Sequence, residues 1–400
     1  MHRMPTLPPE ETSIPRGHVL ERIPKIAAVA GVVLLIASFG LGLTGDSEQF
    51  WYSYLVACLF FFSIGLGALF FVLVNIACRA GWSVAVRRLA EHVSVTLPAI
   101  GILFAPLLVW GVHDLYPWTH SEAVAQDPLL QHKSPYLNLP FFYIRAIFYL
   151  LCWTFIAWWF RRQSLRQDEA GDPGITRKLQ TLSPPALIIF SFTLTFAAFD
   201  WIMSLDPHWY STIFGVYFFA GCFLSSLAFM VLIFLRLHSG GLLTQVVTYE
   251  HFHDLGKLIL AFVVFWAYIG FSQFMLIWYS SIPEETLWFT HRWEHGWMPV
   301  SIFLAAGHFG LPFFFLLSSN VKRKPATLTL VCSWLLLVHY LDLYWLVMPS
   351  RGGFHPHYLD LLCWLGLGGV FLGVLGWAMR PNLVAIRDPR LPESLSYENV

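Results

Sequence analysis

Ten apolar runs, each about 20 residues long, constrain the fold of this chain more than any other feature. A bilayer crossing needs about 20 mostly apolar residues, because the hydrocarbon core is about 30 Å thick and a helix rises about 1.5 Å per residue. The runs are approximately 24–44, 51–77, 93–112, 141–160, 185–205, 212–235, 258–280, 297–319, 326–347 and 359–379. The sequence therefore predicts an all-α, polytopic membrane protein with ten transmembrane helices.

The overall composition agrees with this prediction and excludes other classes. Hydrophobic residues make up 57% of the chain and charged residues only 12%, whereas soluble proteins average about 25% charged residues. The 24 Lys and Arg residues are balanced by 24 Asp and Glu residues. With no excess of positive charge, we expect no nucleic-acid partner.

The positive charges alternate between the two sides of the predicted spans. Twenty of the 24 Lys and Arg residues lie in the N-terminal stretch up to Lys25 and in 78–92, 161–184, 236–257, 320–325 and 380–400. The opposite loops hold only Lys133, Arg292 and Arg351, and Arg145 lies inside the fourth run. By the positive-inside rule, both termini are expected to be cytoplasmic. We predict a tail over 1–23, a ten-helix membrane domain over 24–380 and a second tail over 381–400.

Ionisable residues inside the bilayer are costly, so each one is a candidate for function. Arg145, Asp200 and Asp342 lie on three predicted helices, each roughly 6 to 8 Å below the outer end of its helix. His339 precedes Asp342 by three residues and shares its helix face, and His308 is expected within about one turn of the same depth. These residues are the predicted centre of a proton relay.

Further carboxylates and imidazoles extend this centre toward both surfaces. Asp206, His208 and Asp360 lie near the outer ends of the fifth and tenth runs, and His253 and Asp254 precede the seventh run on the inner side. Asp and His side chains exchange protons, whereas Leu and Phe do not. The pattern predicts proton release at the outer residues and proton uptake at the inner ones.

Simpler interpretations of the same residues stay open at this stage. Arg145 and Asp200 can form a structural ion pair, and Asp254 can cap a helix. His308 and His339 could also hold a single b-type haem, although hydrogen-bonded core histidines are commoner. The six cysteines form no CxxC or CxxCH pair, and no HExxH motif occurs, so we expect no bound metal or covalent cofactor.

Two short patterns indicate how the helices are arranged. The fifth run ends with Phe-Asp-Trp-Ile-Met at 199–203 and the ninth contains Leu-Asp-Leu-Tyr-Trp at 341–345, so each carries a buried Asp followed by Trp. This echo predicts two four-helix bundles, helices 2–5 and 6–9, plus two peripheral helices. Gly369 and Gly373 give the tenth run a small-residue face, which predicts close packing against another helix.

Four segments carry a resemblance to a known family. They are Phe-Asp-Trp-Ile-Met-Ser-Leu-Asp-Pro-His-Trp-Tyr-Ser at 199–211, His-Phe-His-Asp-Leu-Gly-Lys at 251–257, Phe-Ser-Gln-Phe-Met-Leu-Ile-Trp-Tyr at 271–279 and His-Tyr-Leu-Asp-Leu-Tyr-Trp at 339–345. The chain resembles the NrfD-like membrane subunits of bacterial alternative complex III, a quinol:cytochrome c (or other periplasmic acceptor) oxidoreductase. It looks most similar to their shorter, ActF type.

This resemblance implies a membrane subunit without redox centres, which supports menaquinol oxidation and transmembrane proton transfer in a respiratory or photosynthetic chain. The implied partners are haem-bearing and iron-sulfur subunits, a second NrfD-like subunit, the lipid bilayer and the quinone pool, with menaquinone or menaquinol as the ligand. The implied location is the bacterial inner membrane. Residue by residue, the resemblance reaches Asp200, Asp206, His208, His339 and Asp342.

The hypothesis from the sequence assigns a role to each group. Asp200, Asp342 and His339 would carry protons and Arg145 would tune them, with Asp206, His208 and Asp360 at the exit. The alternative is a stand-alone secondary transporter of an ion or small organic anion, with Arg145 as the anion site. Broken helices would favour that alternative, and prolines at 98, 106 and 312 could break the third and eighth runs. However, no matched pair of Gly or Pro interruptions appears in the two halves of the chain.

Overall fold

The computed structural model describes residues 8–15 and 17–398, and all of the regular secondary structure within them is helical. Ten of the helices in this described part are long and apolar enough to cross a membrane. They span Val19–Thr44, Ser47–Ala77, Val84–Leu115, Leu139–Ala170, Pro173–Leu205, Phe214–Ser239, Tyr249–Ser280, Met298–Leu317, Pro325–Ser350 and Tyr358–Ala378. The predicted all-α, ten-helix membrane fold is confirmed, and every predicted run lies within or close to one of these spans.

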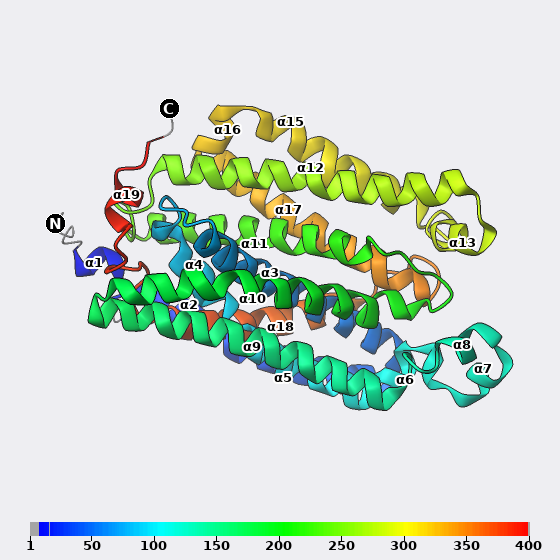
Figure 1. Cartoon of the computed structure of the whole chain (residues 1–400). Coiled ribbons are helices and arrows are strands. Elements are labelled where there is room, and N and C mark those ends of the chain that lie inside the picture. Colours follow the sequence, from blue (N-terminus) through cyan, green and yellow to red (C-terminus); the bar gives the residue numbers. More distant parts are fainter. Residues whose placement is uncertain (1–7, 16, 399–400) are drawn as a thin grey trace.

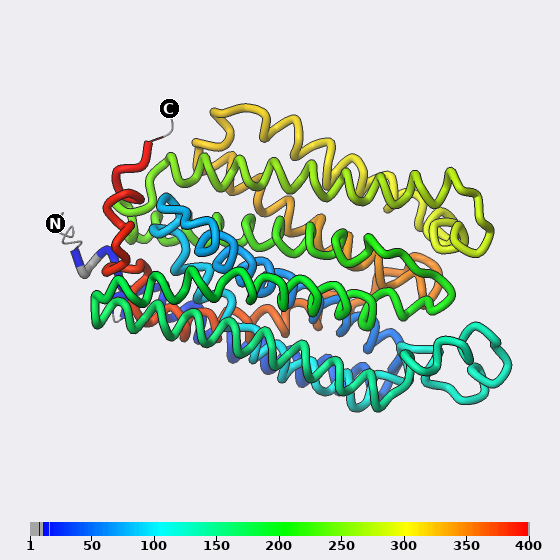
Figure 2. The backbone as a smooth tube through the Cα atoms, in the orientation of Figure 1, coloured from blue at the N-terminus to red at the C-terminus, as the bar shows by residue number. Residues whose placement is uncertain are grey.

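The long helices lie side by side, and both ends of the described chain lie at the same end of the bundle (Figure 1). We call this the terminal end, and the other the opposite end. The uninterrupted spans are α2 (Val19–Thr44), α3 (Ser47–Ala77), α9 (Leu139–Ala170), α10 (Pro173–Trp201), α11 (Phe214–Ser239), α12 (Tyr249–Ser280), α17 (Pro325–Val347) and α18 (Tyr358–Ala378). At the opposite end, α7 (Ser121–Gln126) and α8 (Pro128–Lys133) form a small projection that is plain in the tube view (Figure 2).

The helix α3 lies at the centre of the molecule. It packs against α10, α11, α17 and α18 and against α4 (Val84–Ser94). Most of its side chains are buried, which explains why this run is apolar on every face. Because α3 contacts helices of both predicted four-helix groups, the division into two bundles stays a prediction.

The small-residue face of α18 packs directly on α2. A Cβ atom at Gly369 would lie 2.3 Å from the carbonyl oxygen of Ala27 and 2.7 Å from the Cα atom of Gly31. No side chain larger than hydrogen fits there, and close approach of two backbones is how membrane helices gain van der Waals contact. The close packing predicted for Gly369 is confirmed.

Two spans are interrupted by wide π-helical turns. In the third span, α5 (Leu97–Pro106) is followed by η1 (Leu107–Gly111) and α6 (Val112–Leu115). In the eighth, η4 (Ala305–Gly310) separates α14 (Met298–Leu304) from α15 (Leu311–Leu317). Each turn lies within two residues of a proline, which cannot donate the regular helical hydrogen bond. At Pro106 and Pro312 the helix is therefore widened but continuous, and the breaks that these prolines could have caused are not found there.

Several helices continue beyond the predicted apolar runs at the terminal end. Helix α12 begins at Tyr249 rather than near 258, and its N-terminal cap is Thr248 with His251 in a capping box. The interpretation of Asp254 as the cap is therefore wrong, because this residue lies inside the helix and pairs with Lys257. Helix α2 similarly begins at Val19, inside the predicted tail. Apolar composition marks where the bilayer ends, but a helix continues as long as its polar residues find partners.

Helix α10 passes through two prolines, Pro184 and Pro185, close to where the predicted apolar run begins. Pro184 has no N–H group to donate to the carbonyl of Gln180. The Ser183 hydroxyl donates to that carbonyl instead, at 3.3 Å. A neighbouring side chain thus replaces the lost backbone hydrogen bond, and the helix continues without a break.

The segment after α18 is packed against the bundle rather than free. Leu383, Val384 and Leu391 are buried, and the Leu383 N–H donates to the carbonyl of Thr12. The Asp388 carboxylate accepts a hydrogen bond from Arg87 of α4 at 2.8 Å. Burial alone would raise the pKa of Asp388, but Arg87 and the nearby Arg390 lower it to about 2. The predicted tail over 381–400 therefore closes the terminal end as far as residue 398.

Candidate functional site

Arg145 and Asp200 form a two-pronged ion pair between α9 and α10. The guanidinium donates from Nε to Oδ2 at 2.8 Å and from Nη2 to Oδ1 at 2.9 Å. Tyr149 adds a hydrogen bond to Oδ2 at 2.8 Å, and Arg145 also donates to the carbonyl of Tyr136. Both charges are compensated, which is the arrangement that makes a buried ion pair tolerable. The predicted ion pair between these two residues is present, and whether Asp200 also carries protons stays a prediction.

Asp342 lies at a similar depth on α17 but has no positively charged partner. Its Oδ1 accepts a hydrogen bond from the Tyr217 hydroxyl of α11, and its Oδ2 accepts one from Trp266 Nε1 of α12 at 3.2 Å. Among the described residues, Asp342 forms no salt bridge. Arg292, which is also buried near the opposite end, donates its hydrogen bonds to backbone carbonyls instead. Ionising Asp342 would therefore place an uncompensated negative charge in the core.

Two buried histidines lie beside this carboxylate. His339 Nε2 is hydrogen-bonded to Ser63 of α3 at 2.9 Å, and the rings of His308 and His339 are 6.3 Å apart. In the described part of the chain, His339 Nδ1 and both ring nitrogens of His308 have no protein hydrogen-bond partner. A Cβ atom at Gly221 would meet the His339 ring at 2.9 Å, so glycine is needed to make room for it. Because unpaired buried nitrogens are costly, they mark a place for water or for a transferred proton.

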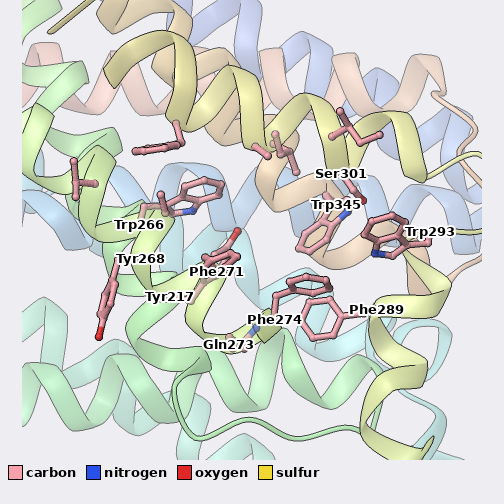
Figure 3. Close-up of a pocket in the computed structure, with 17 residues that line it drawn as sticks. Tyr217, Trp266, Tyr268, Phe271, Gln273, Phe274, Phe289, Trp293, Ser301 and Trp345 are labelled. Atoms are coloured by element: carbon pink, nitrogen blue, oxygen red, sulfur yellow. Dashed lines mark hydrogen bonds between the residues drawn. The ribbon is translucent and has the colours of Figure 1, made fainter. Parts of the chain in front are cut away.

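A cavity of about 610 Å³ is lined in part by the two residues that donate to Asp342 (Figure 3). Tyr217 and Trp266 line it together with a ring of apolar and aromatic side chains from α12, α13 (Pro283–His291) and α14. Phe271 and Ile302, which also line it, are 63% and 55% exposed, so the cavity reaches the outer face of the bundle. In a membrane that face contacts lipid. The cavity is thus suited to an apolar ring compound that enters from the bilayer.

The remaining outer residues lie apart from this cluster. Asp360 is buried at the start of α18 and accepts hydrogen bonds from the Ser53 hydroxyl and the His357 backbone N–H. His208 is exposed and pairs with Asp127, and Asp206 is half-buried. Within residues 8–15 and 17–398, no hydrogen bond or ion pair joins these three residues to Asp342, so their role as an exit stays a prediction.

The proposed uptake residues lie at the terminal end. His253 is hydrogen-bonded to Ser319, and Asp254 pairs with Lys257. Twelve residues of α12 separate Asp254 from Trp266, which corresponds to roughly 18 Å along the helix. Apart from Lys257, the intervening residues are nonionisable and mostly apolar, so α12 itself supplies no proton carriers over this distance.

The structure divides the predicted relay into two clusters. It brings Asp342, His339 and His308 together, and it holds Arg145 with Asp200 in a separate pair. The contacts of Arg145 are with Asp200 and with the loop before α9, so the expectation that it also tunes Asp342 has no support in the geometry. Sequence reasoning missed the hydroxyl and indole donors, Tyr149, Tyr217, Trp266 and Ser63, because nothing local distinguishes them from other aromatic or small residues of a membrane helix.

No group of three or more His, Cys, Asp or Glu side chains that could hold a metal ion occurs in 8–15 and 17–398. Comparison with known protein families and with curated proteins finds no match for this chain. The class that the fold defines is therefore a multi-pass, ten-helix membrane protein, and its activity has to be inferred from the site.

Proposed function

We propose that this chain is a membrane subunit that moves protons for a quinol-oxidising complex. One observation carries the proposal: Asp342 is buried without a countercharge, and its two hydrogen-bond donors line an aromatic cavity that reaches the lipid-facing surface. A hydroquinone is an apolar ring compound of the bilayer that releases protons when it is oxidised. A tyrosine hydroxyl both donates and accepts, so Tyr217 can pass such a proton to Asp342.

In this proposal, Asp342 and the two histidines act as one proton-carrying unit. A proton on Asp342 removes the uncompensated charge, and the unpaired nitrogens of His339 and His308 offer the next acceptors. Ser63 and Ser225, whose hydroxyls are 3.3 Å apart, extend the polar contacts of His339 toward α3 and α11. The pair of Arg145 and Asp200 holds α9 and α10 together at the same depth.

The resemblance to NrfD-like subunits supports the wider setting of the proposal. The chain would assemble with haem-bearing and iron-sulfur subunits and with a second NrfD-like subunit, and menaquinol from the quinone pool would be the substrate. It would contribute no redox centre of its own. The excess of Lys and Arg at the terminal end supports a bacterial inner-membrane protein with both termini in the cytoplasm.

Purification and one substitution test the function. A tag on this chain should recover haem-bearing partners, and Asp342→Asn should leave the recovered complex intact while proton release per electron falls at least about tenfold. The matched control is Glu284→Gln, which changes an exposed carboxylate at the opposite end of the bundle. It should change neither the recovery of the complex nor the proton release per electron. Unchanged proton and electron fluxes in Asp342→Asn would refute the proposed role of Asp342.

Reporter fusions test the orientation. A fusion in the projection at Asp127 and one in the turn at Gly171, between α9 and α10, should report opposite compartments, with Gly171 in the cytoplasm. The same compartment for both fusions would contradict the arrangement of the spans.

A second candidate function is a stand-alone transporter of an ion or small organic anion. The π-helical turns η1 and η4 favour it, because interrupted helices commonly form the substrate sites of transporters. The candidate anion site, Arg145, is already occupied by Asp200, which speaks against anion binding there. Purification separates the two functions, since a transporter should be recovered alone and without haem absorbance.

A further inference from the structure

A basic hollow on the surface of α9 lies outside the site described above. It has a volume of about 400 Å³ and is lined by Val95, Trp158, Arg161, Arg162, Leu165, Arg166 and Glu169. All but Val95 belong to α9, at spacings of three and four residues, and therefore share one face of that helix. Three of the seven lining residues are arginines and one is an acid.

These three arginines have no carboxylate partner among the described residues. Arg161 is hydrogen-bonded to His92 and to the carbonyl of Ala378, and Arg162 lies over the Trp158 ring, 5.0 Å from its centre. No salt bridge of the described chain includes Arg161, Arg162 or Arg166. The hollow thus has a positive charge that the protein does not neutralise.

Neighbouring acids are already used by other arginines. Glu91 pairs with Arg87 and Arg88, Asp168 pairs with Arg88, and Asp388 pairs with Arg87. All five of these residues are buried inside the terminal end. Only Glu169, which is exposed, remains to offset the three arginines of the hollow.

The position of the hollow along α9 places it at the membrane surface. The predicted apolar run of this helix ends at 160, so Arg161 is the first residue beyond the hydrocarbon region. Below it, Leu151, Phe155 and Trp158 are 63%, 60% and 47% exposed and continue the same face toward the bilayer centre. An apolar stripe under a cluster of arginines matches the two parts of a phospholipid, its acyl chains and its phosphate.

We propose that this hollow binds the headgroup of an anionic phospholipid. The guanidinium groups of Arg162 and Arg166 contact the phosphate with paired N–H donors, and Arg161 contributes charge from its half-buried position. The acyl chains lie against Leu151, Phe155 and Trp158. This inference is independent of the proposed function, because it concerns neither the cavity nor Asp342.

Native mass spectrometry of the full chain, with any partners that copurify, tests the proposal. The protein is transferred to detergent micelles doped with either phosphatidylglycerol or phosphatidylcholine, and bound lipid is measured. The wild type should retain phosphatidylglycerol in preference to phosphatidylcholine. Arg162→Gln with Arg166→Gln should weaken that retention roughly 25-fold, about fivefold for each charge near a membrane surface. These two residues are exposed, so the double variant should fold normally.

Arg177→Gln with Lys178→Gln is the matched control. It removes two exposed charges from the same end of the bundle, on α10, that do not line the hollow, and it should retain lipid as the wild type does. Equal loss in both double variants would overturn the proposal in favour of unspecific attraction. Equal retention of phosphatidylcholine would overturn it as well. Displacement of the lipid by millimolar inorganic phosphate would overturn the proposal too, because the hollow would then be a phosphate site. An acidic protein bound at the hollow instead of a lipid would also overturn it.

Discussion

Asp200 and Asp342 are two aspartates at a similar depth of the bundle, but they differ in whether a cation is bound to the carboxylate. Each lies near the outer end of its helix, and each accepts a hydrogen bond from a tyrosine, Tyr149 or Tyr217. Only Asp200 also has an arginine. A buried carboxylate with a bound guanidinium keeps its charge and serves as a structural tie, whereas one with only neutral donors is free to exchange a proton.

The difference can be followed to single positions of the chain. Arg145 lies four residues before Tyr149 on α9, so both side chains face Asp200. Four residues before Tyr217 the sequence has Ile213, the residue that precedes α11. The second site therefore repeats the tyrosine of the first, but the sequence has no cation at the corresponding offset. Substitutions at these positions test the comparison directly.

The largest effect is expected from Arg145→Gln. It leaves Asp200 buried and charged without its partner, and breaking such a pair costs roughly 3 to 5 kcal/mol. We expect a strongly lowered thermal unfolding temperature in detergent, or failure of the protein to accumulate. Asp342 has no cation to lose, so Asp342→Asn should shift unfolding by less than about 1 kcal/mol. If Arg145→Gln were as stable as the wild type, the ion pair at Asp200 would not be a structural tie, and the proposed difference between the two sites would be wrong.

The second effect concerns the two aspartates themselves. Asn preserves the shape of Asp but carries no proton, so Asp342→Asn should lower proton release per electron at least about tenfold with little change in stability. Asp200→Asn should instead destabilise the protein, because it leaves Arg145 without a counterion. Paired measurements of proton flux and unfolding on both variants decide the matter. If Asp200→Asn impairs flux in a fully stable protein, Asp200 is a proton carrier as well, as the sequence suggested.

A smaller effect should follow from removing the tyrosine hydroxyls. Tyr149→Phe removes one of three donors to Asp200 and should cost about 1 to 2 kcal/mol of stability without slowing proton transfer. Tyr217→Phe removes one of two donors to Asp342 and should slow proton transfer several-fold. The two variants serve as controls for each other. Similar behaviour of both would mean that the tyrosines are only packing residues.

The last effect appears only in acid and concerns the pH dependence of a third buried carboxylate, Asp388, which lies outside the spans. Arg87 and Arg390 lower the pKa of Asp388 to about 2, below the value of about 3.9 for an unfolded chain. A lowered pKa stabilises the folded state above pH 3.9, and this contribution disappears as the pH falls toward 2. It amounts to at most about 3 kcal/mol and is fully present at neutral pH.

Hydrogen exchange of the segment after α18 measures this contribution. The difference in protection between the wild type and Asp388→Asn should be constant from pH 7 to pH 4 and should vanish between pH 4 and pH 2. Comparing the two proteins cancels the effects of ionisable groups that both proteins share. A difference that already vanishes near pH 6 would show that arginine does not hold this carboxylate in its charged form.

The sequence by itself determined the ten spans, because apolar composition over about 20 residues is a local property that the bilayer selects directly. It also identified Arg145, Asp200, Asp342, His339 and His308 as exceptions, since each is a polar residue in an apolar run. Close packing of the tenth run was predicted because its glycines lie on one helix face, but its partner, α2, was not predicted. Helix ends were predicted less well where polar residues continue a helix beyond the membrane, as at Tyr249 of α12.

Only the tertiary structure decided which of these residues meet. Depth along a helix follows from counting residues, but the direction of a side chain around the bundle depends on how all ten helices pack. Arg145 and Asp342 were placed in one layer by depth, yet α9 presents Arg145 to α10 alone, while Asp342 meets Tyr217 and Trp266. Hydrogen bonds between helices join residues that are far apart in the chain. The sequence therefore shows which donors and acceptors are present, but not which of them pair.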